Sequence, residues 1–293
     1  MKYAGIAVTL IICVAACTAL SQTQAVEKAP AHVSSPAVNA GDKTNSPNPA
    51  QKTLRIISNF SSPPFSYKEG MKRVGFEIDL AEALGKELGA KIEWVEMNFN
   101  INTYASAMDR GTADAAISSI SITPERKEQL AFTPPYFRTS LAVAVNKDVD
   151  WEHQWFTSGL KGWKVGVMRN TTGEKWARDN LAADIETYSS VERLVQRLKN
   201  SRGALKSGRA GFCILHDQAI LRWALSDYSY RYQIAEKDIA RESYGIAVSK
   251  GKPKLLAELN DALKKLNTSG AYRKIYKKWY TQAEEQNLPP LPE

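Results

Sequence analysis

The chain has 293 residues, of which 43% are hydrophobic and 24% are charged, as is typical of a globular protein. A mean hydropathy of −0.36 excludes a polytopic membrane protein. The formal net charge of +8 suits nucleic acid, a membrane surface or acidic solutes, and it does not choose among them. Three cysteines exclude a disulfide scaffold, and three histidines leave few ways to build a zinc site.

The N-terminus has the pattern of an export signal, in which one lysine precedes a short apolar run from Ala4 to Cys17. This run is shorter than the roughly 20 apolar residues that a membrane-spanning helix needs. Residues 14–17 read VAAC and resemble the lipobox of bacterial lipoproteins, which predicts that Cys17 is lipidated. Ordinary cleavage after Ala25 is the alternative. Both interpretations predict an exported protein that works in the periplasm or another extracytoplasmic space.

Residues 18–52 contain almost no large apolar side chains, so they cannot bury enough surface to offset the entropy of ordering them. We interpret them as a disordered tether, and we expect the folded body to begin near Thr53. Cys213 is then the remaining cysteine of the body. It lies in the apolar segment GFCIL, which predicts a buried strand residue.

The first half of the body alternates predicted strands with a helix. Residues 54–58 form a strand, and Leu80, Leu84 and Leu88 recur at helical spacing until Gly89 ends the helix. Further strands are predicted in three segments, 91–96, 113–118 and 141–145.

A second series follows, and it again alternates strands with helices. The predicted elements are a strand over 163–168, a helix from Thr172, a strand near Ile185, a helix over 191–198, strands over 212–215 and 242–248, and two basic helices at the end. This alternation predicts an α/β fold with mostly parallel sheets.

Motifs of common enzyme classes are missing from the sequence. It contains no G-x-G-x-x-G, phosphate loop, G-x-S-x-G or H-E-x-x-H motif. Only His153 and His216 lie in the body, and we interpret both as surface or packing residues. The sequence therefore favours a binding protein over an enzyme, without a metal or another cofactor.

A first informative loop covers residues 118–126, which read SSISITPER. Thr123 followed by Pro124 predicts a helix start, with Arg126 near the third helical position. A cation there opposes the helix dipole. A surface ion pair with a glutamate is one explanation. The other is that Arg126 and the serine hydroxyls bind an anion, because a guanidinium can hold a carboxylate through two parallel hydrogen bonds.

A second loop, 168–174, reads MRNTTGE and lies between a predicted strand and a predicted helix. Thr171 and Glu174 have the spacing of a capping box, which by itself explains the pattern. A helix N-terminus after a strand can also bind an anion. Open α/β sheets bind ligands beyond the carboxyl ends of their strands. Two such loops in two α/β series therefore predict a cleft.

From about residue 53 to 282 the chain resembles bacterial extracytoplasmic solute-binding proteins of polar amino-acid ABC transporters. The segments that carry the resemblance are 63–66 (PPFS), 74–81 (VGFEIDLA), 114–126 (DAAISSISITPER), 132–136 (FTPPY), 165–167 (VGV) and 270–279 (GAYRKIYKKW). The resemblance implies a two-lobed fold of the periplasmic-binding-protein type (type II) with a hinged cleft. It also implies that the basic, aromatic C-terminus is a closing helix and not a nucleic-acid site.

The expected organisation follows from the tether and the resemblance together. It comprises a signal peptide with a lipobox (1–17), a tether (18–52), a first lobe (53–139 and 244–282), a second lobe (140–243) and a C-terminal tail (283–293).

The resemblance implies a carboxylate site in the cleft. Arg126 would hold the ligand carboxylate, and Ser121 and Thr172 would donate hydrogen bonds to the same group. Thr171, in the same loop as Thr172, belongs to this predicted site.

The rest of the implied site binds the other parts of an amino acid. Ser119 would offer its backbone carbonyl to the ligand ammonium, and Phe99 would pack on the aliphatic part. Asn59 and Ser62 would line the side-chain pocket, where proteins that bind basic amino acids have acidic and aromatic residues.

Gly211 departs from the resemblance, because it occupies the position of an aspartate that would pair with the α-ammonium. This departure predicts that the site does not require an α-amino group, so that deaminated analogues bind as well as amino acids. The alternative is that His216 or Glu242 supplies the missing acceptor.

The function implied is capture of an amino acid or related small carboxylate by hinge closure, and its delivery to an ABC permease in the inner membrane. We expect a monomer that does not bind nucleic acid. Two alternatives are a dehydratase of a prephenate-like acid on the same fold and a sensory domain that reports ligand occupancy to a partner.

Overall fold

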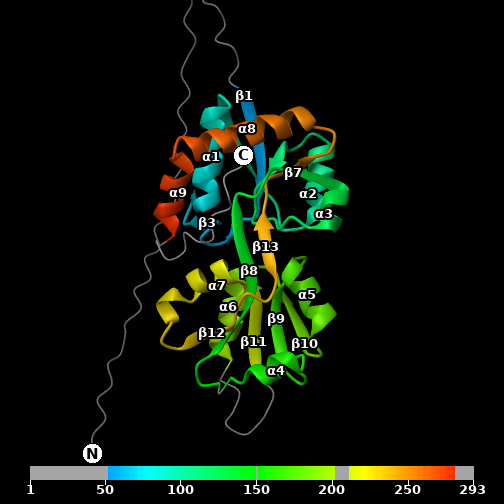
Figure 1. Ribbon diagram of the computed structural model, residues 1–293, viewed down its shortest axis with the longest axis vertical. Coiled ribbons are helices and arrows are strands. Elements are labelled where there is room, and N and C mark those ends of the chain that lie inside the picture. The colour runs from blue at the N-terminus through cyan, green and yellow to red at the C-terminus, as the bar shows by residue number, and fades with distance from the viewer. Residues whose placement is uncertain (1–51, 150, 202–210, 281–293) are drawn as a thin grey trace, which may run out of the picture. The chain divides into compact units, whose positions relative to one another are not determined.

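A computed structural model describes residues 52–149, 151–201 and 211–280, which all belong to one unit, 47–293. The strands of this part of the chain form two main sheets and a small third one (Figure 1). The predicted signal peptide, the lipobox with Cys17, nearly all of the predicted tether and the tail from 283 lie outside the described residues. Within the described residues, no helix combines the length and apolarity that crossing a membrane requires.

The first lobe is built on a sheet with the strand order β5-β1-β6-β14-β7. β1 pairs parallel with β5 and β6, whereas β14 pairs antiparallel with β6 and β7. The strands are β1 (Lys52–Ser58), β5 (Ala90–Glu96), β6 (Ala115–Ala116), β7 (Leu130–Phe132) and β14 (Ala247–Ser249).

Side chains of β1 alternate between the two faces of this sheet. Leu54 and Ile56 belong to the apolar cluster that includes residues of α1, α8 and α9, and Ile57 belongs to the cluster around α2. The helices of the first lobe are α1 (Phe76–Glu87), α2 (Ile101–Asp109), α3 (Pro124–Gln129), α8 (Pro253–Thr268) and α9 (Ala271–Trp279). A small sheet lies before α1 in the chain, with strands β2 (Ser61–Ser62), β3 (Ser66–Glu69) and β4 (Lys72–Val74).

The second lobe is built on a sheet with the strand order β10-β9-β11-β8-β12. Its strands are β8 (Phe137–Asn146), β9 (Lys164–Met168), β10 (Asp184–Tyr188), β11 (Phe212–Asp217) and β12 (Tyr232–Glu236). Cys213 is fully buried in β11, which confirms its interpretation as a core strand residue.

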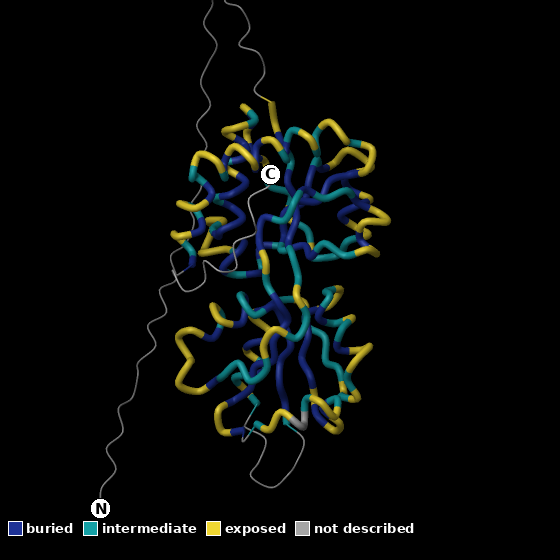
Figure 2. The backbone as a smooth tube through the Cα atoms, viewed as in Figure 1, coloured by how far each residue is buried: buried dark blue, intermediate teal, exposed yellow. Residues whose placement is uncertain are grey.

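Helices cover both faces of this second sheet. An apolar cluster with Ala177 of α5 covers one face, and a cluster with Leu194 of α6 and Ile220 of α7 covers the other. Burial is accordingly concentrated in the central strands of each lobe (Figure 2). The helices are α4 (His153–Thr157), α5 (Thr172–Asn180), α6 (Val191–Asn200), α7 (Gln218–Ala224) and the 3-10 turn η1 (Ser226–Tyr228).

Two strands pass between the lobes (Figure 1). The first half of β8 pairs antiparallel with β13 (Arg241–Tyr244), so that Thr139 lies opposite Glu242. The predicted lobe boundaries, 139/140 and 243/244, fall within this paired segment. The single strand expected over 242–248 is instead two strands, β13 and β14. Between them, the amide of Gly245 donates to the carbonyl of Ile120 at 3.1 Å.

The crossing strands are anchored in the first lobe by an aromatic cluster. The Phe137 ring meets Phe65 edge-on at 4.8 Å and stacks on Tyr276 at 6.0 Å. Tyr244, at the end of β13, packs against the same Phe65 at 5.2 Å. Such aromatic pairs contribute about 0.5–1.5 kcal/mol each beyond their buried area. Bending of the crossing strands is therefore expected on the side of the second lobe.

The α/β class is as predicted, but the expectation of mostly parallel sheets is wrong. β8, β12, β13, β14 and β7 all pair antiparallel with neighbours in the main sheets. The reason is the double crossing, because a chain that leaves the first lobe and returns adds strands of opposite direction to both sheets.

Candidate functional site

The loops at the carboxyl ends of the strands meet in one cleft, as the general rule for α/β sheets predicts. The first lobe contributes the loops after β1, β5 and β6, and the second lobe those after β9 and β11. The residues that line the cleft are Asn59, Ser62, Phe99, Ser118, Ser119, Ser121, Arg126, Met168, Thr171, Thr172, His216, Asp217 and Ile220. Of the nine predicted ligand-binding residues, this set contains all except Gly211.

The cavity between these residues measures about 20 Å³. This is on the order of the volume that one water molecule requires. The space between these loops therefore does not hold a solute much larger than water.

Arg126 is held by the helix start that the sequence predicts. Thr123 caps α3, and its Oγ1 accepts from the Arg126 amide at 3.2 Å. The Arg126 side chain is 8% exposed, donates to the Ser121 carbonyl at 2.8 Å and lies 5.5 Å from the centre of the Phe99 ring. The interpretation as a surface ion pair is therefore wrong. Burial lowers the pKa of Arg126, and the charges of Glu242 and Asp217 oppose that shift.

The start of α5 is capped much as predicted. Thr171 Oγ1 accepts from the Glu174 amide at 3.2 Å, but Glu174 Oε2 accepts from Asn170, one residue before the cap, at 2.7 Å. The Thr171 hydroxyl donates to the Met168 carbonyl at 2.7 Å. Because that hydrogen is committed, Thr172 and not Thr171 has a hydroxyl hydrogen to give to a group in the cleft.

Ser119 is held in place by hydrogen bonds to the buried carboxyl group of Glu77. Glu77 Oε1 accepts from the amide of Ser119 at 2.7 Å, from its hydroxyl at 3.1 Å and from the Tyr136 hydroxyl at 2.5 Å. Ser119 has a φ of 50°, a left-handed conformation that costs a residue with a side chain about 1–2 kcal/mol. Both polar donors of Ser119 face Glu77, which leaves its carbonyl to accept from a ligand.

Asp217, which the sequence did not single out, lines the cleft beside His216, one of the two alternative acceptors. Both residues end β11, and Asp217 Oδ1 is a buried oxygen without a hydrogen-bond partner of good geometry in the described part of the chain, although the Tyr244 hydroxyl lies near Asp217. His216 Nδ1 lies 2.8 Å from the Asp217 amide and 3.1 Å from Asp217 Oδ2. His216 Nε2 is buried and has no partner among the same residues.

The structure corrects the assignment of Gly211. Gly211 precedes β11, and its carbonyl accepts from Lys164, the first residue of β9, at 3.0 Å. The cleft lies at the other end of β11, about 20 Å away at 3.3 Å per residue. Gly211 therefore does not line the cleft, and the predicted lack of an aspartate there is wrong, because Asp217 lines it.

Asn59, Ser62 and Phe99 form the first-lobe wall of the cleft. Asn59 Nδ2 donates to Ser62 Oγ at 3.3 Å, so this part of the wall is polar and uncharged. The Phe99 carbonyl accepts from Asn170 Nδ2 of the second lobe at 3.3 Å. This bond joins the two lobes directly across the cleft.

Glu242 of β13 lies at the edge of the cleft and is a second carboxylate there. Its Oε2 accepts a short hydrogen bond from Ser121 Oγ, and the Thr172 side chain lies near its carboxylate. Burial, and then the charge of Asp217, raise the pKa of Glu242.

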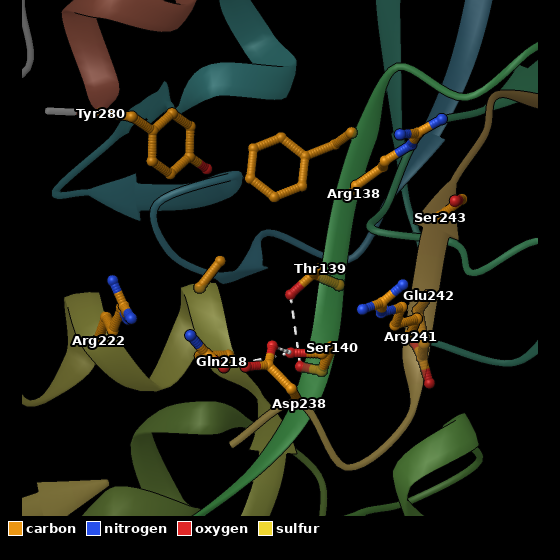
Figure 3. Close-up of a pocket in the computed structure, with 12 residues that line it drawn as sticks. Arg138, Thr139, Ser140, Gln218, Arg222, Asp238, Arg241, Glu242, Ser243 and Tyr280 are labelled. Carbon is orange, nitrogen blue, oxygen red and sulfur yellow. Dashed lines mark hydrogen bonds between the residues drawn. The ribbon is translucent and has the colours of Figure 1, made fainter. Parts of the chain in front are cut away.

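Two larger cavities border the cleft. One, of about 680 Å³, is lined by the 123–126 loop, the start of α5 and Glu242. The other, of about 530 Å³, lies along β8 and β13, where Ser140 Oγ is 3.1 Å from Asp238 Oδ1 and 3.2 Å from Gln218 Oε1 (Figure 3). Neither contains as many of the predicted site residues as the cleft. Among the residues that the structure describes, no group of three or more His, Cys, Asp or Glu side chains is arranged to hold a metal ion.

Residues 54–282 match the family described as bacterial extracellular solute-binding proteins, family 3. A putative ABC transporter arginine-binding protein of Escherichia coli K12 is 32% identical over 238 residues, which cover 79% of this chain and 92% of the relative. An ABC transporter glutamine-binding protein of Bacillus subtilis strain 168 is 32% identical over 208 residues, 70% of this chain and 72% of the relative.

Solved structures give the same result. An ancestral arginine-binding protein bound to glutamine is 35% identical, with a TM-score of 0.67, and the match covers 78% of this chain and 97% of the other. An ancestral amino acid-binding protein described as a precursor of cyclohexadienyl dehydratase is 32% identical, with a TM-score of 0.68 and coverage of 78% and 96%.

The network of Glu77 yields a prediction about stability and pH. Burial raises the pKa of Glu77 to about 7, although three hydrogen bonds from Ser119 and Tyr136 lower it. The folded state therefore keeps a proton that the unfolded chain loses near pH 4.5. The stabilisation is complete below pH 4.5 and is lost as the pH rises through 7, by about 3 kcal/mol for a shift of this size.

Glu77→Gln cannot ionise, so we expect its free energy of unfolding to fall less than that of the wild type between pH 5 and pH 7. Urea unfolding at the two pH values measures the difference. Glu82→Gln, exposed on the same helix, is the control and should behave like the wild type. An unchanged pH dependence in Glu77→Gln would contradict the assignment.

Proposed function

Because the chain belongs to the bacterial extracellular solute-binding proteins of family 3, we propose that it captures an amino acid in the cleft between its two lobes and delivers it to the permease of an ABC importer. The observation that carries the proposal is the buried guanidinium of Arg126, beside which the hydroxyls of Ser121 and Thr172 converge on one carboxylate. A buried cation with two hydroxyl donors beside it is a site for a carboxylate.

Arg126 has the capacity to bind such a group. A guanidinium carries five N–H donors, and the Ser121 carbonyl is its one hydrogen-bond acceptor among the described residues. The remaining donors can form the paired hydrogen bonds that a carboxylate accepts.

Asp217 and Ser119 supply acceptors for an ammonium group. Asp217 Oδ1 is a buried carboxyl oxygen that is free to accept, and the Ser119 carbonyl lies in a loop that Glu77 holds in place. We therefore propose an α-amino acid as the ligand and no longer a deaminated acid. A zwitterion that bridges Arg126 and Asp217 would neutralise one charge from each lobe, which favours closure.

The polar, uncharged pair Asn59 and Ser62 supports a ligand with a polar side chain. Relatives are named for arginine, histidine and glutamine, so these three amino acids are the first to test. A thermal-shift screen of the purified protein against them and other small carboxylates would identify the ligand. If none raised the melting temperature, this function would be in doubt.

We also propose that the protein is a monomer without catalytic activity. A dehydratase on this fold is the alternative, and the ancestral dehydratase precursor among the similar structures keeps it open to test. The measurement is turnover of a prephenate-like acid by the purified protein, for which we expect no product.

The sequence at residues 14–17 supports a lipid anchor at Cys17 after export. We expect Cys17→Ser to move the protein from the membrane fraction to the soluble fraction, or to leave it unprocessed, because the acceptor thiol is lost. Cell fractionation and N-terminal sequencing provide the measurement. A soluble wild-type protein that begins at Val26 would contradict the anchor.

Arg126→Ala should lower the affinity for the amino-acid ligand more than a hundredfold. Loss of one partner of a buried charge pair costs roughly 3–5 kcal/mol, and each 1.4 kcal/mol is tenfold in Kd. Arg126→Lys should recover little, because one ammonium cannot form the paired hydrogen bonds. Calorimetry measures Kd, and Lys127→Ala, which removes an exposed cation one residue away, is the control. Near wild-type affinity in Arg126→Ala would contradict the proposed role.

The proposed role of Asp217 predicts the affinity of the protein for deaminated analogues relative to amino acids. The wild type should bind the amino acid at least tenfold more tightly than the matched deaminated acid, because the ammonium pairs with Asp217. Asp217→Asn should reduce that preference and leave affinity for the deaminated acid nearly unchanged. Calorimetry with matched pairs of ligands tests this. Equal preference in both proteins would mean that Asp217 does not recognise the ammonium.

A further inference from the structure

Glu242 lies beside the groups that a ligand carboxylate would use. Ser121 of the first lobe donates a short hydrogen bond to its carboxylate, and Thr172 of the second lobe lies near that carboxylate and lines the same cavity as Glu242. The charge of Glu242 also acts on the Arg126 guanidinium, as the strongest of the nearby charges that raise the pKa of Arg126 against the effect of burial. The same three side chains are the ones that the proposed function assigns to the ligand.

These hydroxyls cannot serve two carboxylates at once. A serine or threonine hydroxyl has one hydrogen to donate. Two carboxylates in one site also repel each other, so that both are not charged at the same time without a large penalty. A ligand carboxylate and the Glu242 carboxylate therefore exclude one another from Ser121 and Thr172.

The backbone of Glu242 is held in a strand pair, whereas its side chain borders two cavities into which it can rotate. Glu242 pairs with Thr139 in the β8–β13 ladder, and the next residue, Ser243, accepts from the Ile122 amide at 2.8 Å. The residue lines both larger cavities, of about 680 and 530 Å³, on β13 (Figure 3). Rotation of the side chain into either cavity would free Ser121 and Thr172 without a change in the strand.

We propose that Glu242 is an internal occupant of the carboxylate site, which a ligand must displace from Ser121 and Thr172 in order to bind. This inference rests on the proposed function for the identity of the ligand, but not for the site itself. Because Glu242 is hydrogen-bonded to Ser121 of one lobe and lies beside Thr172 of the other, the occupant also favours the approach of the two lobes. Glu242 thus sets the affinity of the cleft and its tendency to close.

A first experiment uses acetate, the simplest carboxylate with a methyl group, and so needs no amino-acid ligand. In Glu242→Ala the site is free, and acetate should raise the melting temperature above that in chloride at equal ionic strength. The wild type should show little or no shift. The double variant Glu242→Ala/Arg126→Ala should show none, because the cation is gone. An acetate shift that is equal in the wild type and Glu242→Ala, or absent from both, would overturn the proposal.

A second experiment measures Kd by calorimetry with L-glutamine, L-arginine and L-histidine. Removal of a competitor should tighten binding about tenfold or more in Glu242→Ala, and less in Glu242→Gln, whose amide oxygen can still accept from the hydroxyls. Glu242→Gln also keeps the volume of the side chain, so it tests the proposal should the alanine variant fold poorly. Weaker binding in both variants would mean that Glu242 recognises a cationic part of the ligand, and would overturn the proposal.

Glu125→Ala is the matched control. Glu125 also acts on Arg126 through its charge, but it is exposed and has no bond to Ser121 or Thr172. If Glu125→Ala responded to acetate as strongly as Glu242→Ala, the effect would come from charge alone and not from occupancy. If Glu242→Ala bound acetate through Arg126 while no amino acid bound any variant, the proposed function would fail and the inference about Glu242 would stand.

Discussion

A buried guanidinium has to be compensated, and the cleft is organised around this requirement for Arg126. The Thr123 cap fixes the backbone of Arg126, and the Ser121 carbonyl takes one of its donors. The remaining positive charge is balanced by carboxylates that approach from β11 and β13, Asp217 and Glu242. A cation as deeply buried as Arg126 is stable only when an anion lies close to it.

The same site holds two carboxylates and one cation. This imbalance contributes to the raised pKa of Glu242. One cation, Arg126, faces Asp217 and Glu242, and the pKa of Glu242 is raised by burial and by Asp217. A zwitterionic amino acid brings no net charge, so it cannot remove the surplus. Either a proton or a change in the position of Glu242 must do so. Ligand binding, protonation and the position of one side chain are therefore coupled in this cleft.

Local signals in the sequence predicted the parts of the site that depend on neighbours in the chain. The caps at Thr123 and Thr171 and the helix starts that follow them are short-range features, and they are present. The helix α2 was missed although Asn100 caps it and Ile101, Tyr104, Ala105 and Met108 recur at helical spacing. The assignment of Gly211 was wrong because it rested on the residues next to it in the chain and not on the direction of the strand that follows. The direction of the predicted strand 212–215 would have placed its carboxyl end, with His216 and Asp217, at the cleft.

Glu242 was named only as a substitute acceptor, because its position depends on contacts that no local pattern encodes. Ser121 and Tyr244 are bridged across 123 positions of the chain, and that bridge brings the side chain of Glu242 to the hydroxyl of Ser121. The bridge exists because the chain returns from the second lobe on β13, which pairs with β8. A residue on a crossing strand thus contacts both lobes whatever its sequence neighbours are. The strand that connects the lobes also carries the proposed competitor for the carboxylate site, so release of that site is linked to opening of the cleft.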